Sequence, residues 1–86
     1  MSVATIKIYR DLGPHHKREL AADALVKTLS VDRESDKPLN KQRAKQLLQR
    51  TFPELGKVWY VWEHEDGWQK SVEYEGMQAW ALVCRE

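Results

Sequence analysis

The histidines and the single cysteine of this 86-residue sequence are considered first as metal ligands or nucleophiles. His15 and His16 are adjacent, and neighbouring residues of a helix point about 100° apart, so they cannot bind one metal ion from one face. Cys84 would need a nearby base and a lowered pKa to act as a nucleophile. The strand register derived below places His64 on the same sheet face as Cys84, but not opposite it. We therefore expect an inert cysteine and no metal site.

Two glutamates form the pattern closest to a pair of catalytic acids. Glu63 and Glu65 point the same way from one predicted strand. Lys70 stands opposite Glu63 in the predicted register, which favours a solvated ion pair over acid–base catalysis. The sequence has no glycine-rich phosphate loop, no Cys/His metal spacing and no Gly-x-Ser-x-Gly motif. We expect a protein that is not an enzyme and needs no cofactor.

A cationic helix face is the first surface on which binding chemistry is expected. Residues 37–57 carry six basic side chains and one acidic side chain, whereas residues 58–86 have a net charge of −4. Arginine and glutamine reach base edges, and lysine and arginine neutralise phosphates. The residues of this face are Lys41, Arg43, Lys45, Gln46, Gln49 and Arg50. The same composition also suits an ordinary solvated face, and a net charge of +1 is low for a protein that reads genomic DNA.

An aromatic surface is the second candidate. The stretch "VWYVWEHEDGW", residues 58–68, holds three of the four tryptophans. The pairs 66–67 and 75–76 predict two-residue hairpin turns, and the first of these is the stronger signal. The resulting register predicts a core face made of Trp59, Val61, Val72, Tyr74, Met77, Ala79, Ala81 and Val83. The opposite face carries the candidate protein-binding residues Tyr60, Trp62, Glu73, Trp80 and Leu82.

Two alternatives to an open aromatic face remain at this point. The first strand or the long loop between the helices could fold over the rings. A slip of one residue in the register would exchange the two faces. Exposed contiguous apolar patches usually mark interaction sites, whereas single exposed aromatic side chains are common on protein surfaces. The sequence therefore leaves the exposure of Trp62 and Trp80 open.

Helices and strands must position these two surfaces. Pro14 suits the first residue of a helix, and apolar residues between Leu20 and Leu29 recur at helical spacing. Asn40 suits an N-cap, and Pro53 ends the second helix near Phe52. The predicted elements are a strand at Thr5–Arg10, helices at 14–29 and from Asn40 to Phe52, and strands at Lys57–Glu65, Trp68–Tyr74 and Met77–Arg85.

This order predicts an α+β two-layer sandwich in a single domain spanning residues 1–86. The order is β-α-α-β-β-β, with two helices packed on one face of an antiparallel sheet of three or four strands. A chain of this size buries only about 60–65% of the surface that its unfolded form exposes, so the core is small. Whether the first strand pairs in the main sheet is left open.

Composition favours a cytoplasmic protein without a membrane segment. Charged residues make up 31% of the chain and apolar residues 42%, which is typical of soluble globular proteins. No apolar run approaches the roughly 18 residues that span a membrane, and the N-terminus lacks the apolar core of a secretory signal. Cys84 is the only cysteine, so an internal disulfide cannot form, which suits a reducing compartment.

We expect a small non-enzymatic protein–protein interaction module that docks through the aromatic face. A protein of this size suits a regulator or inhibitor of a larger assembly, as bacterial or phage accessory proteins are. The alternative is a nucleic-acid-binding protein that uses the cationic helix face, with weak and salt-sensitive affinity. The sequence does not specify which protein is the partner.

Overall fold

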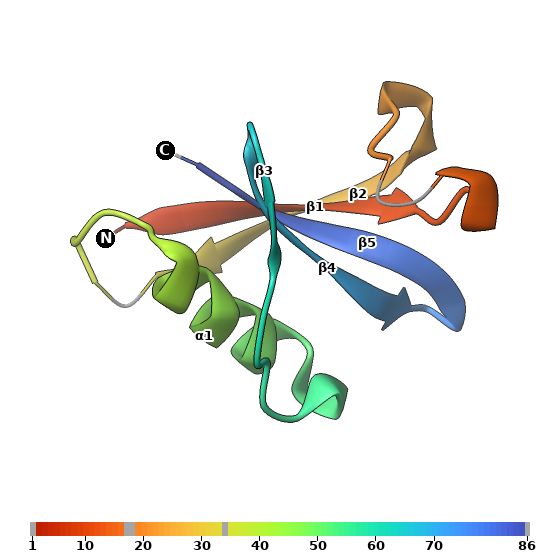
Figure 1. Cartoon of the computed structure of the whole chain (residues 1–86). Helices are drawn as coiled ribbons and strands as arrows, with labels where there is room; N and C mark the ends of the chain where they lie inside the picture. Colours follow the sequence, from red (N-terminus) through yellow and green to blue (C-terminus); the bar gives the residue numbers. More distant parts are fainter. Residues whose placement is uncertain (1, 17–18, 34, 86) are drawn as a thin grey trace.

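The computed structural model describes residues 2–16, 19–33 and 35–85. Within these ranges one α-helix and five strands form, with three short 3-10 helices between them (Figure 1). The elements are β1 Val3–Arg10, η1 Pro14–His16, η2 Ala22–Ala24, β2 Leu25–Asp32, α1 Lys41–Thr51, η3 Pro53–Leu55, β3 Trp62–His64, β4 Gly67–Tyr74 and β5 Met77–Cys84.

The five strands form one antiparallel sheet in the order β2-β1-β5-β4-β3. The predicted fold of two helices on a sheet of three or four strands is therefore wrong, because the described chain contains a single α-helix and a larger sheet. The first strand is an interior strand of the sheet, where β2 and β5 pair with its two edges. An interior position satisfies the backbone groups on both sides of β1.

The helix predicted at 14–29 does not form. Its ends become the 3-10 turn η1 and the strand β2, and residues 17–18 lie outside the described ranges. β2 pairs with β1 from Val3↔Asp32 to Ile8↔Lys27. Pairing with the open edge of β1 outweighs the helical spacing of the apolar residues, since tertiary context overrides local propensity. Within β2, Leu29 and Val31 pack against the core, and Ala24 just before the strand is also buried.

The second predicted helix is confirmed as α1. The Asn40 side chain caps it, because Asn40 Oδ1 accepts a hydrogen bond of 2.9 Å from the Arg43 backbone N–H. The inner stripe is buried through Ala44, Leu47 and Leu48. The helix ends at Thr51, just before the proline that begins η3.

The turn and register predicted between the last two strands are confirmed. Gly76 and Glu75 occupy the turn with φ angles of 78° and 50°, both in the left-handed region that short hairpin turns require. β4 and β5 pair from Gly67↔Cys84 to Tyr74↔Met77. The alternation of side chains between the two sheet faces was therefore correct for both strands.

The strand predicted at 57–65 is reduced to the three residues of β3. Its pairing with β4 is also offset by two residues from the prediction. His64 lies opposite Gly67, whereas the predicted register places it opposite Gln69. Side chains alternate with a period of two, so an offset of two residues leaves each β3 side chain on its predicted face.

The main core lies between α1 and one face of the sheet. Its fully buried members are Ile6, Ile8, Ala44, Leu48, Ala79, Ala81 and Val83, and Ala4, Leu47, Phe52, Val58, Val61, Trp68 and Val72 complete it. The opposite sheet face is buried in part. Leu82 and Gln69 face each other there and are each 2% exposed, and Tyr9 beside Trp80 is buried. The sheet therefore buries side chains on both faces.

Candidate functional site

Three neighbouring aromatic side chains stand out from the surface between α1 and β3. Trp59, Tyr60 and Trp62, here called the aromatic strip, are 72%, 53% and 40% exposed. The alternating strand expected here does not begin until Trp62, so Val58 and Val61 take the buried positions and the rings between them turn outward. The prediction that Trp59 belongs to the core is wrong for this reason.

The strip is fixed to α1 at its start. The Val58 backbone N–H donates a hydrogen bond of 2.6 Å to Gln49 Oε1 on the helix. The Tyr60 and Trp62 rings meet edge to face, with centroids 5.8 Å apart and planes at 89°. Edge-to-face pairs are a favoured aromatic geometry. The strip is therefore a held surface rather than a set of separately moving rings.

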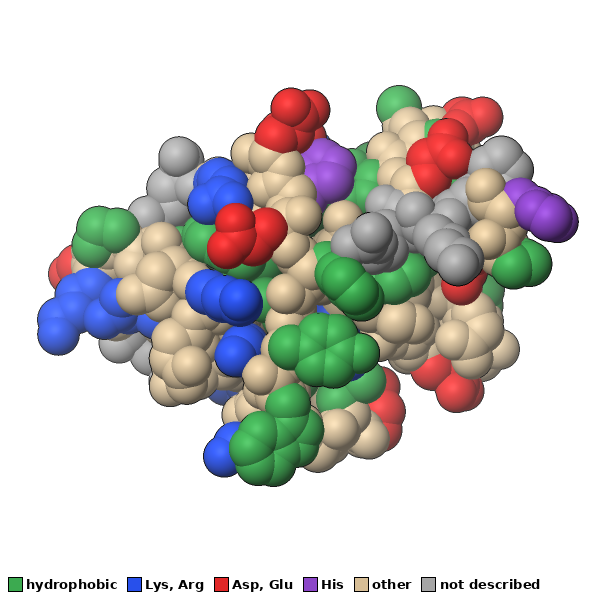
Figure 2. Space-filling view, viewed as in Figure 1, with side chains coloured by type: hydrophobic (Ala, Val, Ile, Leu, Met, Phe, Trp, Pro, Cys, Tyr) green, Lys and Arg blue, Asp and Glu red, His purple; other side chains and the backbone are tan. Residues whose placement is uncertain are grey.

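Two lysines lie over the rings of the strip. Lys57 Nζ is 4.3 Å from the Trp59 ring centroid, and Lys70 Nζ is 4.5 Å from the Tyr60 centroid. Both distances are within the range of cation–π attraction. Figure 2 shows hydrophobic side chains gathered over the segment that joins α1 to β3, with lysine and arginine side chains over α1 and the chain before it. The exposed strip is thus aromatic and locally cationic.

The sequence-derived docking residues do not all reach the surface. Tyr60, Trp62 and Glu73 are exposed, whereas Leu82 is 2% exposed and Trp80 is half-buried. The Trp80 Nε1 atom is buried and has no hydrogen-bond partner among the described residues. The structure brings Tyr60 and Trp62 together but places Leu82 where a partner cannot touch it without rearrangement.

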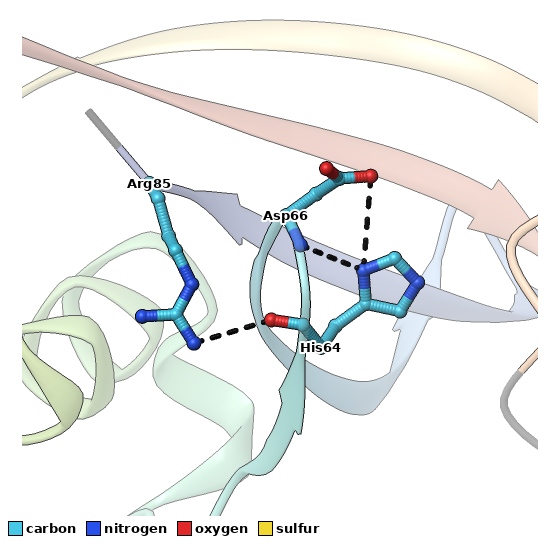
Figure 3. Close-up of polar contacts among 3 residues, drawn as sticks. All are labelled: His64, Asp66 and Arg85. Atoms are coloured by element: carbon cyan, nitrogen blue, oxygen red, sulfur yellow. Dashed lines mark hydrogen bonds and ion pairs between the residues drawn. The ribbon is translucent and has the colours of Figure 1, made fainter.

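Polar contacts hold the tip of the β3–β4 hairpin, which follows the strip in the sequence (Figure 3). The Asp66 backbone N–H donates a hydrogen bond of 3.0 Å to His64 Nδ1, and the Asp66 carboxylate lies 3.8 Å from the same nitrogen. Arg85 closes the tip from the C-terminal side, since its Nη2 donates to the His64 carbonyl at 3.2 Å. Glu65 at the turn is exposed, so the tip presents acidic groups.

A separate cleft opens between α1 and the chain that joins β2 to α1. Its volume is about 360 Å³. We call it the basic cleft, and its lining residues are Arg33, Ser35, Lys37, Leu39, Arg43, Gln46, Leu47 and Arg50. Four of the eight are cationic and none is acidic. The cleft is therefore a concave site with strong positive charge.

The cationic face predicted for the helix is divided in two. Arg43, Gln46 and Arg50 line the basic cleft, whereas Gln49 faces the opposite flank, where it binds the start of the aromatic strip. At 100° per residue, Lys41 and Lys45 lie on the Gln49 flank. The six residues thus do not form one continuous cationic track along α1.

Sequence reasoning missed Arg33, Ser35 and Lys37 because they were treated as part of a polar loop. These positions lie in the charged stretch "DRESDK", residues 32–37, and all three line the cleft. Asp36 lies between two of them, and its carboxylate accepts a hydrogen bond from the Ser2 hydroxyl. The alternation of basic and acidic residues was the available signal.

The register places His64 and Cys84 in one row across the sheet, on either side of Gly67, and not as direct partners. Burial raises the pKa of the Cys84 thiol, and the Asp66 carboxylate raises it further, while the Lys7 ammonium lowers it. A raised pKa disfavours the thiolate that nucleophilic chemistry needs. The described residues contain no group of three His, Cys, Asp or Glu side chains arranged to hold a metal ion.

Two further findings complete the description. Among the described residues no helix has both the length and the apolar character needed to cross a membrane. Comparison of the chain with protein-family models, curated proteins and solved structures found no match.

Proposed function

We propose that this protein is a small protein-binding module that docks through the aromatic strip and thereby regulates a larger assembly. The observation that carries the proposal is the exposure of Trp59, Tyr60 and Trp62 within four consecutive residues. Tryptophan and tyrosine are enriched at protein interfaces and dominate their binding energy. Keeping three such rings in water is unfavourable for the isolated chain, so burial by a partner supplies the compensating free energy.

The charges beside the strip indicate the chemistry of the partner. Lys57 and Lys70 lie over two of the rings, so a docked surface would meet both ammonium groups together with the aromatic faces. An apolar patch with acidic side chains at its rim complements this arrangement. The acidic hairpin tip would repel such a rim at the far end and so fix the direction of docking.

Nucleic-acid binding through α1 is the second candidate function. The cationic lining of the basic cleft favours it. The division of the helix cations between two flanks opposes it, because a duplex backbone needs several phosphate contacts along one surface. Protein docking therefore remains the first proposal.

The proposal can be tested by affinity capture from the native host with three baits. These are the wild type, the double variant Trp59→Ala/Trp62→Ala, and Val3→Ala. Val3 is 64% exposed on β1 and serves as the apolar surface control. We expect at least one protein to be retained by the wild type and the control but lost from the double variant. Losing one interface aromatic typically costs about 2 kcal/mol, or roughly thirtyfold in affinity.

A purified partner then allows the charge argument to be tested directly. We expect Lys57→Glu to weaken binding and to reduce its dependence on salt, because the variant repels an acidic rim. Circular dichroism melts should show each variant folded. Capture of the same proteins by all three baits, or recovery of nucleic acid alone, would contradict the proposal.

A further inference from the structure

The basic cleft has the features of a ligand site distinct from the aromatic strip. We propose that it binds a small organic phosphate, that is, a phosphate monoester carried on a body the size of a nucleoside. The cleft lies on the flank of α1 away from Gln49 and the strip. Its proposed ligand is therefore independent of the protein docking proposed above.

The charge of the cleft is the first argument. The whole chain has a net charge of +1, yet four cations line this one cleft. A concave site lined by several charges of one sign concentrates ligands of the opposite sign, so this cleft favours an anion.

The placement of two arginines is the second argument. Arg43 Nη1 donates a hydrogen bond of 3.2 Å to the Pro38 carbonyl, and Arg50 Nη2 donates to the Asp32 carbonyl at the end of β2. These bonds hold both guanidinium groups at the cleft before any ligand arrives. A guanidinium presents five donors in a planar fork that matches two phosphate oxygens. Prior ordering of the side chains lowers the entropy lost on binding.

The apolar part of the lining indicates an organic ligand. The partly buried Leu39 lies among the cations, and Ser35 and Gln46 add neutral hydrogen-bonding groups. Inorganic phosphate would use the cations and leave the apolar surface of Leu39 uncovered. A volume of about 360 Å³ also lies at the small end of the ligand-pocket range of about 300–1,000 Å³.

The distribution of charge favours a monoester over a nucleic-acid backbone. A phosphate monoester carries a charge of about −1.5 to −2 at neutral pH, whereas each diester carries only one negative charge. The cations at Lys41 and Lys45 lie on the other flank of α1, so they do not extend the cleft into a cationic groove along the helix of the kind that binds a polymer.

Calorimetric titration of the full chain tests this proposal with AMP, adenosine, inorganic phosphate and an oligonucleotide lacking terminal phosphates. We expect AMP to bind about tenfold or more tightly than the other three, with an affinity that falls as salt rises. The double variant Arg33→Gln/Arg43→Gln should weaken AMP binding by at least about tenfold. Lys37→Gln should weaken it less, because it leaves all three cleft arginines in place.

Lys45→Gln is the matched control, because it removes one charge from the same helix outside the cleft. It should change the affinity for AMP by less than about twofold. The proposal is overturned if AMP does not bind, or if Lys45→Gln weakens binding as much as Lys37→Gln. Equal binding of inorganic phosphate would overturn the organic part, and tighter binding of the oligonucleotide would assign the cleft to nucleic acid instead.

Discussion

Gly67 is the residue at which the sheet tolerates least change. A Cβ atom there would lie 1.9 Å from the Val83 carbonyl oxygen and 2.9 Å from its carbon, and both atoms belong to the backbone of β5. We predict that Gly67→Ala lowers the free energy of unfolding by about 1–3 kcal/mol more than Gly76→Ala does. Gly76 has a positive φ of 78° but open space around its Cα, so the comparison separates the clash from the backbone strain. Urea unfolding would measure both, and equal losses would contradict the prediction.

Cys84 gives the protein a stability term that depends on pH. Burial and Asp66 raise the pKa of its thiol against the opposing effect of Lys7, so the folded state favours the protonated form. This contribution is fully present below the unfolded thiol pKa of about 8.5 and is lost as pH rises through the higher folded pKa. We predict that the wild type loses more stability than Cys84→Ala above about pH 8.5. Parallel urea titrations across this range would show the difference, and parallel declines would count against it.

At the scale of elements, Arg85 ties the β3–β4 hairpin to the C-terminal end of β5. Its guanidinium donates to the His64 carbonyl and lies 4.4 Å from the Trp68 ring centroid, while its backbone N–H donates to the Asp66 carbonyl at 2.8 Å. Arg85→Ala removes the two side-chain contacts and keeps the backbone bond. We predict a loss of about 1–2 kcal/mol, with faster hydrogen exchange in β3 than elsewhere.

The exposed turn residue Glu65 supplies the control for this prediction. Glu65→Ala changes the charge of the same hairpin without removing either Arg85 contact, so hydrogen exchange in β3 should stay near the wild-type rate. If Glu65→Ala speeds exchange as much as Arg85→Ala, then the charge of the tip and not the arginine contacts holds the hairpin. Because β3 carries Trp62, loosening the hairpin should also weaken docking through the aromatic strip.

At the scale of the whole molecule, side chains are buried on both faces of the sheet although α1 covers only one face. Leu82, on the face away from α1, is 2% exposed, whereas Trp59 is 72% exposed. We predict that Leu82→Ala lowers the free energy of unfolding by about 2–5 kcal/mol. Trp59→Ala should change it by less than about 0.5 kcal/mol despite its larger side chain. Chemical denaturation of both variants would measure this. A stable Leu82→Ala variant with impaired docking would show instead that this face opens to a partner.

Features that depend on a few neighbouring residues were predictable from the sequence. Three such features form as predicted: the Asn40 cap, the end of α1 before Pro53 and the Glu75-Gly76 turn. Each depends on contacts between residues that are only a few positions apart in the sequence. The Glu75-Gly76 turn then determines the register of β4 with β5. For the candidate site, the same reasoning correctly placed Trp62 away from the core, since alternation along a strand survives an offset of two residues. Tyr60 is also exposed, although it lies before β3.

Features that depend on distant partners were decided only by the tertiary structure. The segment at 25–32 has a helical spacing of apolar residues, but the open edge of β1 offers it a full ladder of hydrogen bonds, and it becomes β2. Trp59 is exposed because Gln49 holds Val58 against α1 and delays the start of β3. The basic cleft forms because the chain after β2 returns beside α1 and brings Arg33 near the helix. The spacing of residues within one segment does not predict these contacts, because each joins segments that are distant in the sequence and meet only when the chain folds.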